Sequence, residues 1–223
     1  MRLKVVCLIS GGIDSPVAAG QVAKKFDIIP LHFCLYPFYC KGSFETMIMV
    51  LRRLKRKTKF KNLIIYPWAN ILSAILKGQN RKYMCVLCRR AMYKAAELVA
   101  KKEGAQAFAT GESLAQKASQ TLSNLAATSH GLKYPILRPL LGLDKTEIEA
   151  ISKQLGIWSE SHTGCCTATP KYPVTRADTE ILNKLYKELQ IENILEHNFK
   201  KIIKLKSLNK RPLEYLSLFL KRI

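Results

Sequence analysis

The feature that most constrains the fold is a strand-to-helix turn near the N-terminus. Residues 3–10 (LKVVCLIS) form a continuous apolar run, and residues 15–26 (SPVAAGQVAKKF) show helical spacing. Between them stands Ser10-Gly11-Gly12-Ile13-Asp14-Ser15, whose two adjacent glycines allow a sharp turn. A continuous apolar strand is typical of a parallel sheet that helices cover on both faces. This pattern predicts an α/β protein with its first strand buried.

Strands and helices continue to alternate as far as residue 175. Further strands are expected at 27–36, 62–68, 105–110 and 134–142, and helices at 44–58, 86–103 and 145–155. Gly104 and Gly156 are expected to end the last two helices, and Asp144 to cap the third. The alternation predicts a doubly wound, Rossmann-like parallel sheet of about five strands, with its ligand at the carboxyl ends of the strands. We therefore expect an α/β domain over 1–175 and a helical, Lys-rich extension over 176–223 that can pack on the same domain.

The chain is strongly basic, with 37 Lys and Arg against 16 Asp and Glu, a formal net charge of +21. Such an excess of positive charge indicates a polyanionic binding partner, of which nucleic acid is the first candidate and an anionic membrane surface the second. Residues 46–96 contain no acidic residue, and we interpret this stretch as a contact for the phosphate backbone of a nucleic acid, with a merely solvated helix face as the alternative. The candidate nucleic-acid-binding residues are Arg52, Arg53, Lys55, Arg56, Lys57, Arg81, Lys82, Arg89 and Arg90.

Composition excludes other classes of protein. With 48% hydrophobic residues the chain is too apolar for a disordered basic tail. It has no uncharged apolar run of about 18 residues and no recognisable signal peptide. We expect a folded cytoplasmic protein with no membrane partner.

The turn at Ser10–Ser15 has the chemistry of an anion site. Its backbone N–H groups and the positive end of the following helix suit a phosphate or pyrophosphate, and the two serines add hydroxyl donors. Asp14 is out of place in plain anion binding unless it holds Mg²⁺ or orients the loop. The sequence matches neither GxxxxGK[ST] nor GxGxxG, which disfavours simple NTPase and dinucleotide-binding sites. An ordinary strand-to-helix turn is the alternative.

SGGIDS resembles the signature loop of the PP-loop ATP pyrophosphatases, which split ATP into AMP and pyrophosphate while they adenylate a substrate. Within that superfamily the chain resembles the tRNA 4-thiouridine synthetases of the thiamine/thiouridine sulfur-transfer family. The similar stretches are SGGIDSPVA at 10–18, residues 88–125 with TGESLAQKASQT, PILRPLLGLDKTEIEAISKQLG at 135–156 and CCTATPKYPVT at 165–175. The resemblance implies the adenine nucleotide α-hydrolase-like PP-loop fold.

The resemblance also implies a binding site for ATP and Mg²⁺. The phosphates would be held by Ser10, Gly11, Gly12, Asp14 and Ser15. The nucleotide or uridine pocket would be lined by Thr110, Gly111, Glu112, Ser113, Gln116 and Gln120. Charge that develops on the phosphates would be neutralised by Lys145 and Arg138.

Seven cysteines in an intracellular protein argue against a disulfide framework. Cys85-Val-Leu-Cys88, leading into a helix, is typical of metal ligation or redox work. The resemblance makes Cys166 the sulfur-handling residue and Cys165 its neighbour. Cys85, Cys88 and Cys166 are one short of the four ligands of a structural zinc, but they suit an Fe–S cluster with one iron open to sulfide, as the resemblance to chiefly archaeal synthetases also implies. The alternatives are a catalytic dithiol, persulfide chemistry, zinc or thiols without a role.

The activity implied is thiolation of a tRNA uridine, expected at position 8. Its O4 would attack the α-phosphate of ATP, pyrophosphate would leave, and sulfur from cluster-bound sulfide or a Cys166 persulfide would displace AMP to give 4-thiouridine. One alternative is a PP-loop enzyme that adenylates a small molecule or another tRNA base, including thiamine-thiazole sulfur supply. The other is a non-enzymatic basic RNA-binding or Fe–S scaffold.

The expected partners are tRNA, a sulfur donor (sulfide or a persulfide carrier) and a second copy of the chain in a homodimer. Relatives usually carry an N-terminal RNA-binding THUMP region, and some bacterial relatives a C-terminal rhodanese domain. Because the loop begins at residue 10, we expect the THUMP region to be absent, and we expect the rhodanese domain to be absent too. Affinity for the RNA backbone would then come from the basic stretch 46–96 and the Lys-rich tail, or from a separate THUMP-domain protein that acts in trans.

Overall fold

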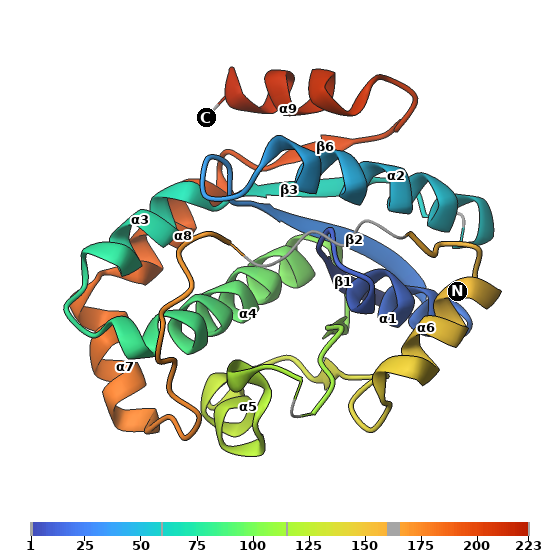
Figure 1. Cartoon of the computed structure of the whole chain (residues 1–223). Coiled ribbons are helices and arrows are strands. Elements are labelled where there is room, and N and C mark those ends of the chain that lie inside the picture. The colour runs from blue at the N-terminus through green and yellow to red at the C-terminus, as the bar shows by residue number, and fades with distance from the viewer. Residues whose placement is uncertain (1, 59, 115, 160–165, 223) are drawn as a thin grey trace.

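The computed structural model describes residues 2–58, 60–114, 116–159 and 166–222. Within them a six-stranded sheet has the order β5-β4-β1-β2-β3-β6, with helices on both faces (Figure 1). Its strands are β1 Lys4–Ile9, β2 Asp27–Cys34, β3 Leu63–Pro67, β4 Ala107–Ala109, β5 Ile136–Leu137 and β6 Ile203–Leu205. Strands β1 to β5 pair in parallel, which confirms the predicted doubly wound α/β sheet, and β6 adds an antiparallel strand beside β3.

The helices follow the predicted alternation, with two additions. They are α1 Asp14–Ala23, α2 Lys41–Thr58, α3 Ala69–Lys77, α4 Met84–Glu103, α5 Leu122–Ser129, α6 Lys145–Gln154, α7 Thr179–Glu188, α8 Ile191–Phe199 and α9 Pro212–Leu220. Two short 3₁₀ turns lie at Arg81–Tyr83 and Ala118–Gln120. Helices α3 and α5, both within the first 175 residues, are the two that were not predicted from the sequence. None of the helices in the described part of the chain has the length and hydropathy needed to cross a bilayer.

The direction in which strands are added to the sheet reverses at β1. The chain adds β2 and then β3 on one side of β1, and β4 and then β5 on the other. In register, Ile9 of β1 lies beside His32 of β2, and Cys7 lies beside Ala109 of β4. The connections after β1 and β4 therefore diverge at the carboxyl edge, where doubly wound sheets bind their ligands.

Each face of the sheet has its own core. Val5 and Cys7 of β1 pack on the face covered by α1, α2, α6 and α9. Val6 points to the other face, covered by α3, α4, α7 and α8, where Trp68 is fully buried and its ring centroid lies 4.5 Å from that of Phe33. This alternation buries both faces and explains the unbroken apolar run of the first strand.

Local signals in the sequence set the helix ends. Gly104 after α4 and Gly156 after α6 both have left-handed φ angles, of 64° and 66°. Asp144 caps α6 in a capping box: it accepts from the Glu147 N–H, and the Glu147 carboxylate accepts from the Asp144 N–H, each at 2.8 Å. All three predicted boundary residues have the expected role.

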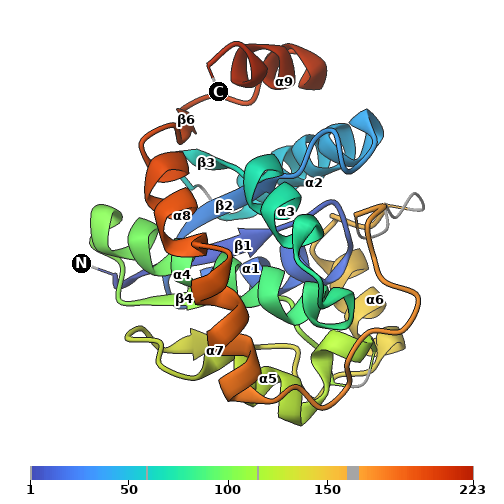
Figure 2. The same ribbon diagram turned by 90° about the vertical axis from the view of Figure 1, so that its left-hand side faces the viewer.

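Residues 176–223 were expected to be helical, and they include β6 as well as α7, α8 and α9. Helices α7 and α8 pack on α4, β6 pairs with β3, and α9 lies on α2 (Figure 2). Lys204 of β6 forms an ion pair with Glu103 at the end of α4, at 2.6 Å. The extension therefore lies against the α/β part along much of its length, and a domain division at residue 175 stays a prediction.

Candidate functional site

The loop after β1 is closed by its two serines. Ser15 Oγ accepts from the backbone N–H of Ser10 at 2.8 Å and lies 2.9 Å from Ser10 Oγ. Ser10 Oγ accepts in turn from the Gly12 N–H at 3.3 Å. Asp14 is the first residue of α1, so the loop lies at the positive end of that helix. The five residues predicted to hold phosphates form one compact turn.

The end of β4 packs directly on this turn through Gly111. A Cβ atom on Gly111 would lie 2.5 Å from the backbone nitrogen of Ser15 and 2.6 Å from the carbonyl carbon of Asp14. Those atoms are backbone and cannot move aside without displacing α1. The predicted second half of the site therefore meets the first, and glycine is needed because of the close approach.

Beside Gly111, the buried carboxylate of Glu112 gathers four donors. The residue is 3% exposed. Thr110 Oγ1 and Arg138 Nε donate to Oε2 at 2.9 and 2.6 Å, while Arg89 and Tyr93 donate to Oε1. Burial alone would raise the pKa of Glu112, but Arg89, the Tyr93 hydroxyl and Arg138 together hold it below its usual value. Glu112 is thus ionised and shapes the end of β4, and Arg138 is its partner.

Arg89 and Tyr93 are members of this network that the sequence reasoning did not place there. They stand four residues apart on α4, so both project from the same face of the helix toward Glu112. The four-residue spacing of Arg89 and Tyr93 is visible in the sequence. Their common partner, Glu112, lies in a loop distant in the chain, so the contact could not be predicted. Arg89 Nη2 also donates to Ser119 Oγ at 3.1 Å, and this bond ties α4 to the loop after β4.

The remaining predicted ATP residues are spread around the same edge. Ser113 Oγ donates to the Leu143 carbonyl at 2.7 Å, and Lys145 is exposed at the first position of α6. Gln120 is buried, and within the described part of the chain its Oε1 has no hydrogen-bond partner. An orphaned buried acceptor of this kind fits a ligand that brings an N–H donor. Gln116 lies in the same connection between β4 and α5.

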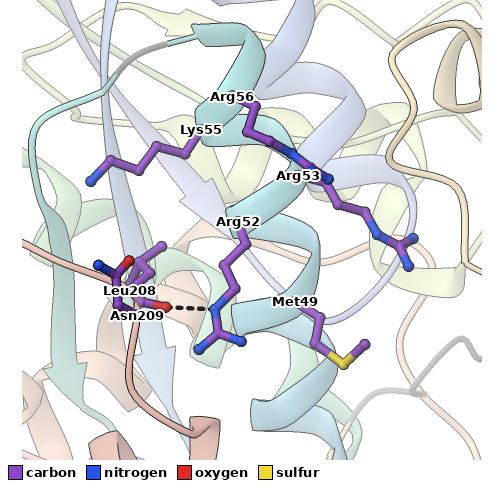
Figure 3. A pocket seen from close by; sticks show the side chains of 7 residues that line it. All are labelled: Met49, Arg52, Arg53, Lys55, Arg56, Leu208 and Asn209. Atoms are coloured by element: carbon purple, nitrogen blue, oxygen red, sulfur yellow. Dashed lines mark hydrogen bonds between the residues drawn. The ribbon is translucent and has the colours of Figure 1, made fainter.

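Four of the five candidate RNA-binding residues of α2, all except Lys57, line a surface pocket of about 700 Å³ (Figure 3). Arg52 donates from Nε to the Leu208 carbonyl at 2.5 Å and from Nη2 to the Lys210 carbonyl, while Lys55 Nζ donates to the Lys206 carbonyl at 3.2 Å. Arg53 Nη1 donates to the Trp158 carbonyl at 2.6 Å. Three of the four cations that line the pocket thus brace neighbouring chain segments.

The other candidate RNA residues divide into two groups. Arg56, Lys57, Arg81 and Lys82 are exposed. Arg90 is 7% exposed and donates from Nη1 to the Ala127 carbonyl at 2.9 Å, while Arg89 binds Glu112. The guanidinium groups of Arg89 and Arg90 bind acceptors within the protein, so these two residues are not part of the proposed RNA surface.

The predicted cysteines lie around the start of α4. Cys85 and Cys88 are in its first turns, where Trp68 Nε1 donates to Cys88 Sγ at 3.2 Å. Cys85 and Cys166 pack at the margin of the same core. Across the residues that the structure describes, no three Cys, His, Asp or Glu side chains come together as a metal site. The described thiols are therefore not assembled as cluster ligands, and Cys165 lies outside the described residues.

Residues 166–178, which we call the strap, carry Cys166 across the carboxyl edge. At its start the Thr167 backbone N–H and Oγ1 donate to the Phe38 carbonyl at 3.0 and 3.1 Å. Further along, the Val174 N–H donates to the Lys82 carbonyl, and Thr121 donates to the Thr175 carbonyl. The strap thus connects the loop after β2 with the starts of α4 and α5 (Figure 2).

Comparison with known proteins decides the family. The family model described as "Thiamine biosynthesis protein (ThiI)" matches residues 2–191. The chain belongs to the ThiI family. The family resemblance and the PP-loop fold expected from the sequence are thereby confirmed.

Among ThiI relatives, a "Probable tRNA sulfurtransferase" of Methanobrevibacter smithii is 39% identical over 204 residues, which cover 89% of this chain and 54% of that protein. One of Thermus thermophilus is 39% identical over 197 residues, covering 86% and 48%. The chain therefore spans about half the length of the curated relatives it matches.

Solved structures share the fold. A crystal structure of a 4-thiouridine synthetase–RNA complex with bound ATP matches with a TM-score of 0.82 and 34% identity, over 91% of this chain and 55% of that one. The U34-tRNA thiolase NcsA of Methanococcus maripaludis, which carries a [4Fe–4S] cluster, matches with a TM-score of 0.54 and 18% identity, over 87% and 72%. The second likeness concerns the fold alone.

Proposed function

We propose that this chain carries out ATP-dependent thiolation of a tRNA uridine, at position 8, to give 4-thiouridine. The observation that carries the proposal is the closed Ser10–Ser15 turn, seated against Gly111 where the strand order reverses. The likeness to a 4-thiouridine synthetase solved with ATP and RNA supports it, as do the tRNA sulfurtransferase relatives.

The chain's own residues fit ATP. Backbone N–H groups of the Gly11–Gly12 turn and the start of α1 receive the phosphates. Gln120 Oε1, buried and without a partner among the described residues, offers an acceptor for the base. Mg²⁺ commonly takes one or two carboxylates together with phosphate oxygens, and Asp14 at the turn fits that role. The metal would offset the negative charge on the leaving pyrophosphate.

The first step is adenylation of the uridine. Its O4 attacks the α-phosphorus, and the bond to pyrophosphate breaks, so that AMP becomes attached through O4 and C4 becomes electrophilic. The turn fixes the phosphates, and exposed Lys145 at the start of α6 contributes positive charge. Arg138 acts indirectly in this scheme, because its Nε is held by Glu112 and it supports the end of β4.

The second step is sulfur transfer, for which we propose Cys166. If the donor is sulfide, its sulfur attacks C4 and AMP leaves with O4, with no change in oxidation state. If Cys166 carries a persulfide, its terminal sulfur attacks C4, the C4–O4 bond breaks so that AMP leaves with O4, and a Cys–S–S–C4 disulfide forms. A second thiol then releases the thiouridine and is left in a disulfide, which an external thiol reductant must restore.

Pyrophosphate release with and without tRNA tests this function. We expect tRNA to stimulate release, Asp14→Ala to abolish it, and Cys166→Ala to retain it while 4-thiouridine formation stops. Mass spectrometry of nucleosides from the reacted tRNA measures the product. Release that does not depend on tRNA would support a small-molecule adenylating enzyme, and no release would support a basic scaffold. Thiolation that persists in Cys166→Ala would contradict the sulfur assignment.

We also propose an iron–sulfur cluster on Cys85, Cys88 and Cys166. The three thiols suit iron, but the described residues do not bring them together, so no step above depends on the cluster. Anaerobically prepared protein is expected to show a brown absorbance that Cys85→Ala removes. Colourless protein with full thiolation activity would eliminate the cluster.

For RNA binding we propose the exposed cations beside the α2 pocket (Figure 3) and those of the turn before α4. Arg53 connects this surface to the nucleotide site, because it holds the Trp158 carbonyl and the adjacent Ile157 lines a small hollow with Gly11 and Gly12. Among the residues that the structure describes, none of those lining the pocket is acidic. A phosphate backbone would therefore meet only positive or neutral groups there.

The salt dependence of tRNA binding tests this surface. Arg56→Ala/Lys57→Ala is expected to weaken binding and to lower the slope of log Kd against log salt by about one per lost phosphate contact. The matched control is Lys24→Ala/Lys25→Ala, which removes two exposed cations just after α1 that are not part of the proposed RNA surface. Equal slopes for the two double variants would contradict the assignment. The sulfur donor, a THUMP-domain partner and a homodimer stay predictions.

A further inference from the structure

We propose that Tyr39 and His32 are positioning residues. They fix the position of the Cys166 strap relative to the Ser10–Ser15 turn, which we call the ATP turn. The inference rests on the proposed function, since it gives these side chains a part in sulfur transfer. It follows from a chain of hydrogen bonds that starts beside Ser10 and ends beside Cys166.

The first bond of the chain joins His32 to the ATP turn. His32 lies at the carboxyl end of β2, is 3% exposed, and has Nδ1 2.9 Å from the carbonyl oxygen of Ile9, the residue before Ser10. A carbonyl can only accept, so Nδ1 carries the proton. Burial lowers the pKa of His32 to about 4, so the ring is neutral near pH 7 and its Nε2 is an acceptor.

The second bond joins His32 to the loop after β2. Tyr39 is 8% exposed, and its hydroxyl oxygen lies 3.2 Å from His32 Nε2 and 3.4 Å from Cys34 Sγ. The tyrosine hydroxyl has one proton, which it donates toward two neighbouring acceptors, His32 Nε2 and Cys34 Sγ. Burial raises the pKa of Tyr39 far above its usual value, so the hydroxyl keeps its proton. Neither member of the pair changes charge across neutral pH.

The third connection runs through the backbone of the same loop. Phe38 precedes Tyr39, and its carbonyl accepts both donors of Thr167, the residue after Cys166. Anything that shifts Tyr39 therefore shifts the acceptor that anchors the strap. A reacting group displaced by about 1 Å can cost on the order of 100-fold in rate, so this anchoring has consequences for transfer between the two sites.

Tyr39→Phe tests the link, because it keeps the ring and removes only the hydroxyl. We expect 4-thiouridine formation to fall about tenfold in kcat, with pyrophosphate release and the KM for ATP within twofold of the unaltered protein. His32→Asn places an amide donor near the Ile9 carbonyl but cannot reach Tyr39, and it should have the same effect. Both substitutions remove the same hydrogen bond between Tyr39 and His32. The double variant should therefore have a kcat for 4-thiouridine formation no lower than that of either single variant.

A second readout does not depend on turnover. Alkylation of Cys166 by iodoacetamide in the folded protein, located by peptide mass spectrometry, should be about fivefold faster in Tyr39→Phe, a factor typical of one net hydrogen bond. The control is Tyr66→Phe, which removes another buried hydroxyl bond, to the Leu195 carbonyl at 2.5 Å on the far face. It should lose similar stability without either effect.

The outcomes separate the two proposals. An unaltered protein that forms no 4-thiouridine refutes the proposed function, while the alkylation rates still test the link. Cys166 alkylation at the unaltered rate in Tyr39→Phe overturns the link, and so does additive loss in the double variant. Equal effects from Tyr66→Phe would mean that the change reflects stability alone and would overturn the positioning role.

Discussion

Replacing Gly111 by alanine is expected to reduce ATP-dependent pyrophosphate release by 100-fold or more. The new methyl group would lie 2.5–2.6 Å from backbone atoms of Asp14 and Ser15, so the start of α1 and the end of β4 must separate. Overpacking of this kind costs about 1–3 kcal/mol of stability, and the displaced turn no longer fits the phosphates. Pyrophosphate release and chemical unfolding of the same preparation measure the two effects.

Gly142→Ala is the matched control. A Cβ on Gly142 would meet nothing within 4 Å, and its φ lies outside the left-handed region. The change should leave pyrophosphate release intact and leave stability equal or higher by up to about 1 kcal/mol, because alanine restricts the unfolded chain. A Gly111→Ala protein with normal release would show that the turn tolerates separation from β4.

Replacing Glu112 by glutamine is expected to destabilise the protein by about 3–5 kcal/mol. Removing one partner of a buried charge cluster leaves the others uncompensated, here Arg89 and Arg138. The free energy of unfolding in urea measures the loss. Glu188→Gln is the control, since Glu188 is 53% exposed and lies 3.8 Å from Lys184, where an ion pair contributes at most about 0.5 kcal/mol.

The same carboxylate makes stability depend on pH. The pKa of Glu112 is lower in the folded protein than its ordinary value of 4.5, so its contribution is present above that value. It is lost as pH falls through the folded pKa, because the folded state must then take up a proton that it binds poorly. Between pH 6 and 3, the free energy of unfolding measured in urea should fall less steeply in Glu112→Gln than in the unaltered protein. Parallel curves for both proteins would contradict the assignment.

Much of the fold can be predicted from short stretches of the sequence. The apolar run before Ser10, the glycines after α4 and α6, and the Asp144 cap each act within a few residues, so their structures follow from neighbours in the chain. Strand β6 differs: Ile203–Leu205 is three residues long and is fixed by pairing with Leu63–Ile65, about 140 positions earlier. Such pairing leaves no local pattern.

The site divides in the same way. The Ser10–Ser15 turn is predictable because its shape is built from its own glycines and serines. The arginines are not: Arg52, Arg53, Arg89 and Arg90 suggest an RNA surface in sequence, yet the fold brings carbonyls or Glu112 to their guanidinium groups. A guanidinium has five donors, and those that already bind carbonyls or Glu112 are not available to an RNA phosphate. Only tertiary structure reveals that.

The two borders of the sheet have a consequence for behaviour at high concentration. Unpaired backbone groups along an outer strand invite pairing with other molecules. One border here is β5, with only two residues, and the other is β6, with three residues and the charged side chain of Lys204. Without β6 the fully buried β3 would be the border and would present five apolar residues to a neighbour. Strand β6 thus covers the edge of β3 and protects it from pairing with strands of other molecules, which would lead to aggregation.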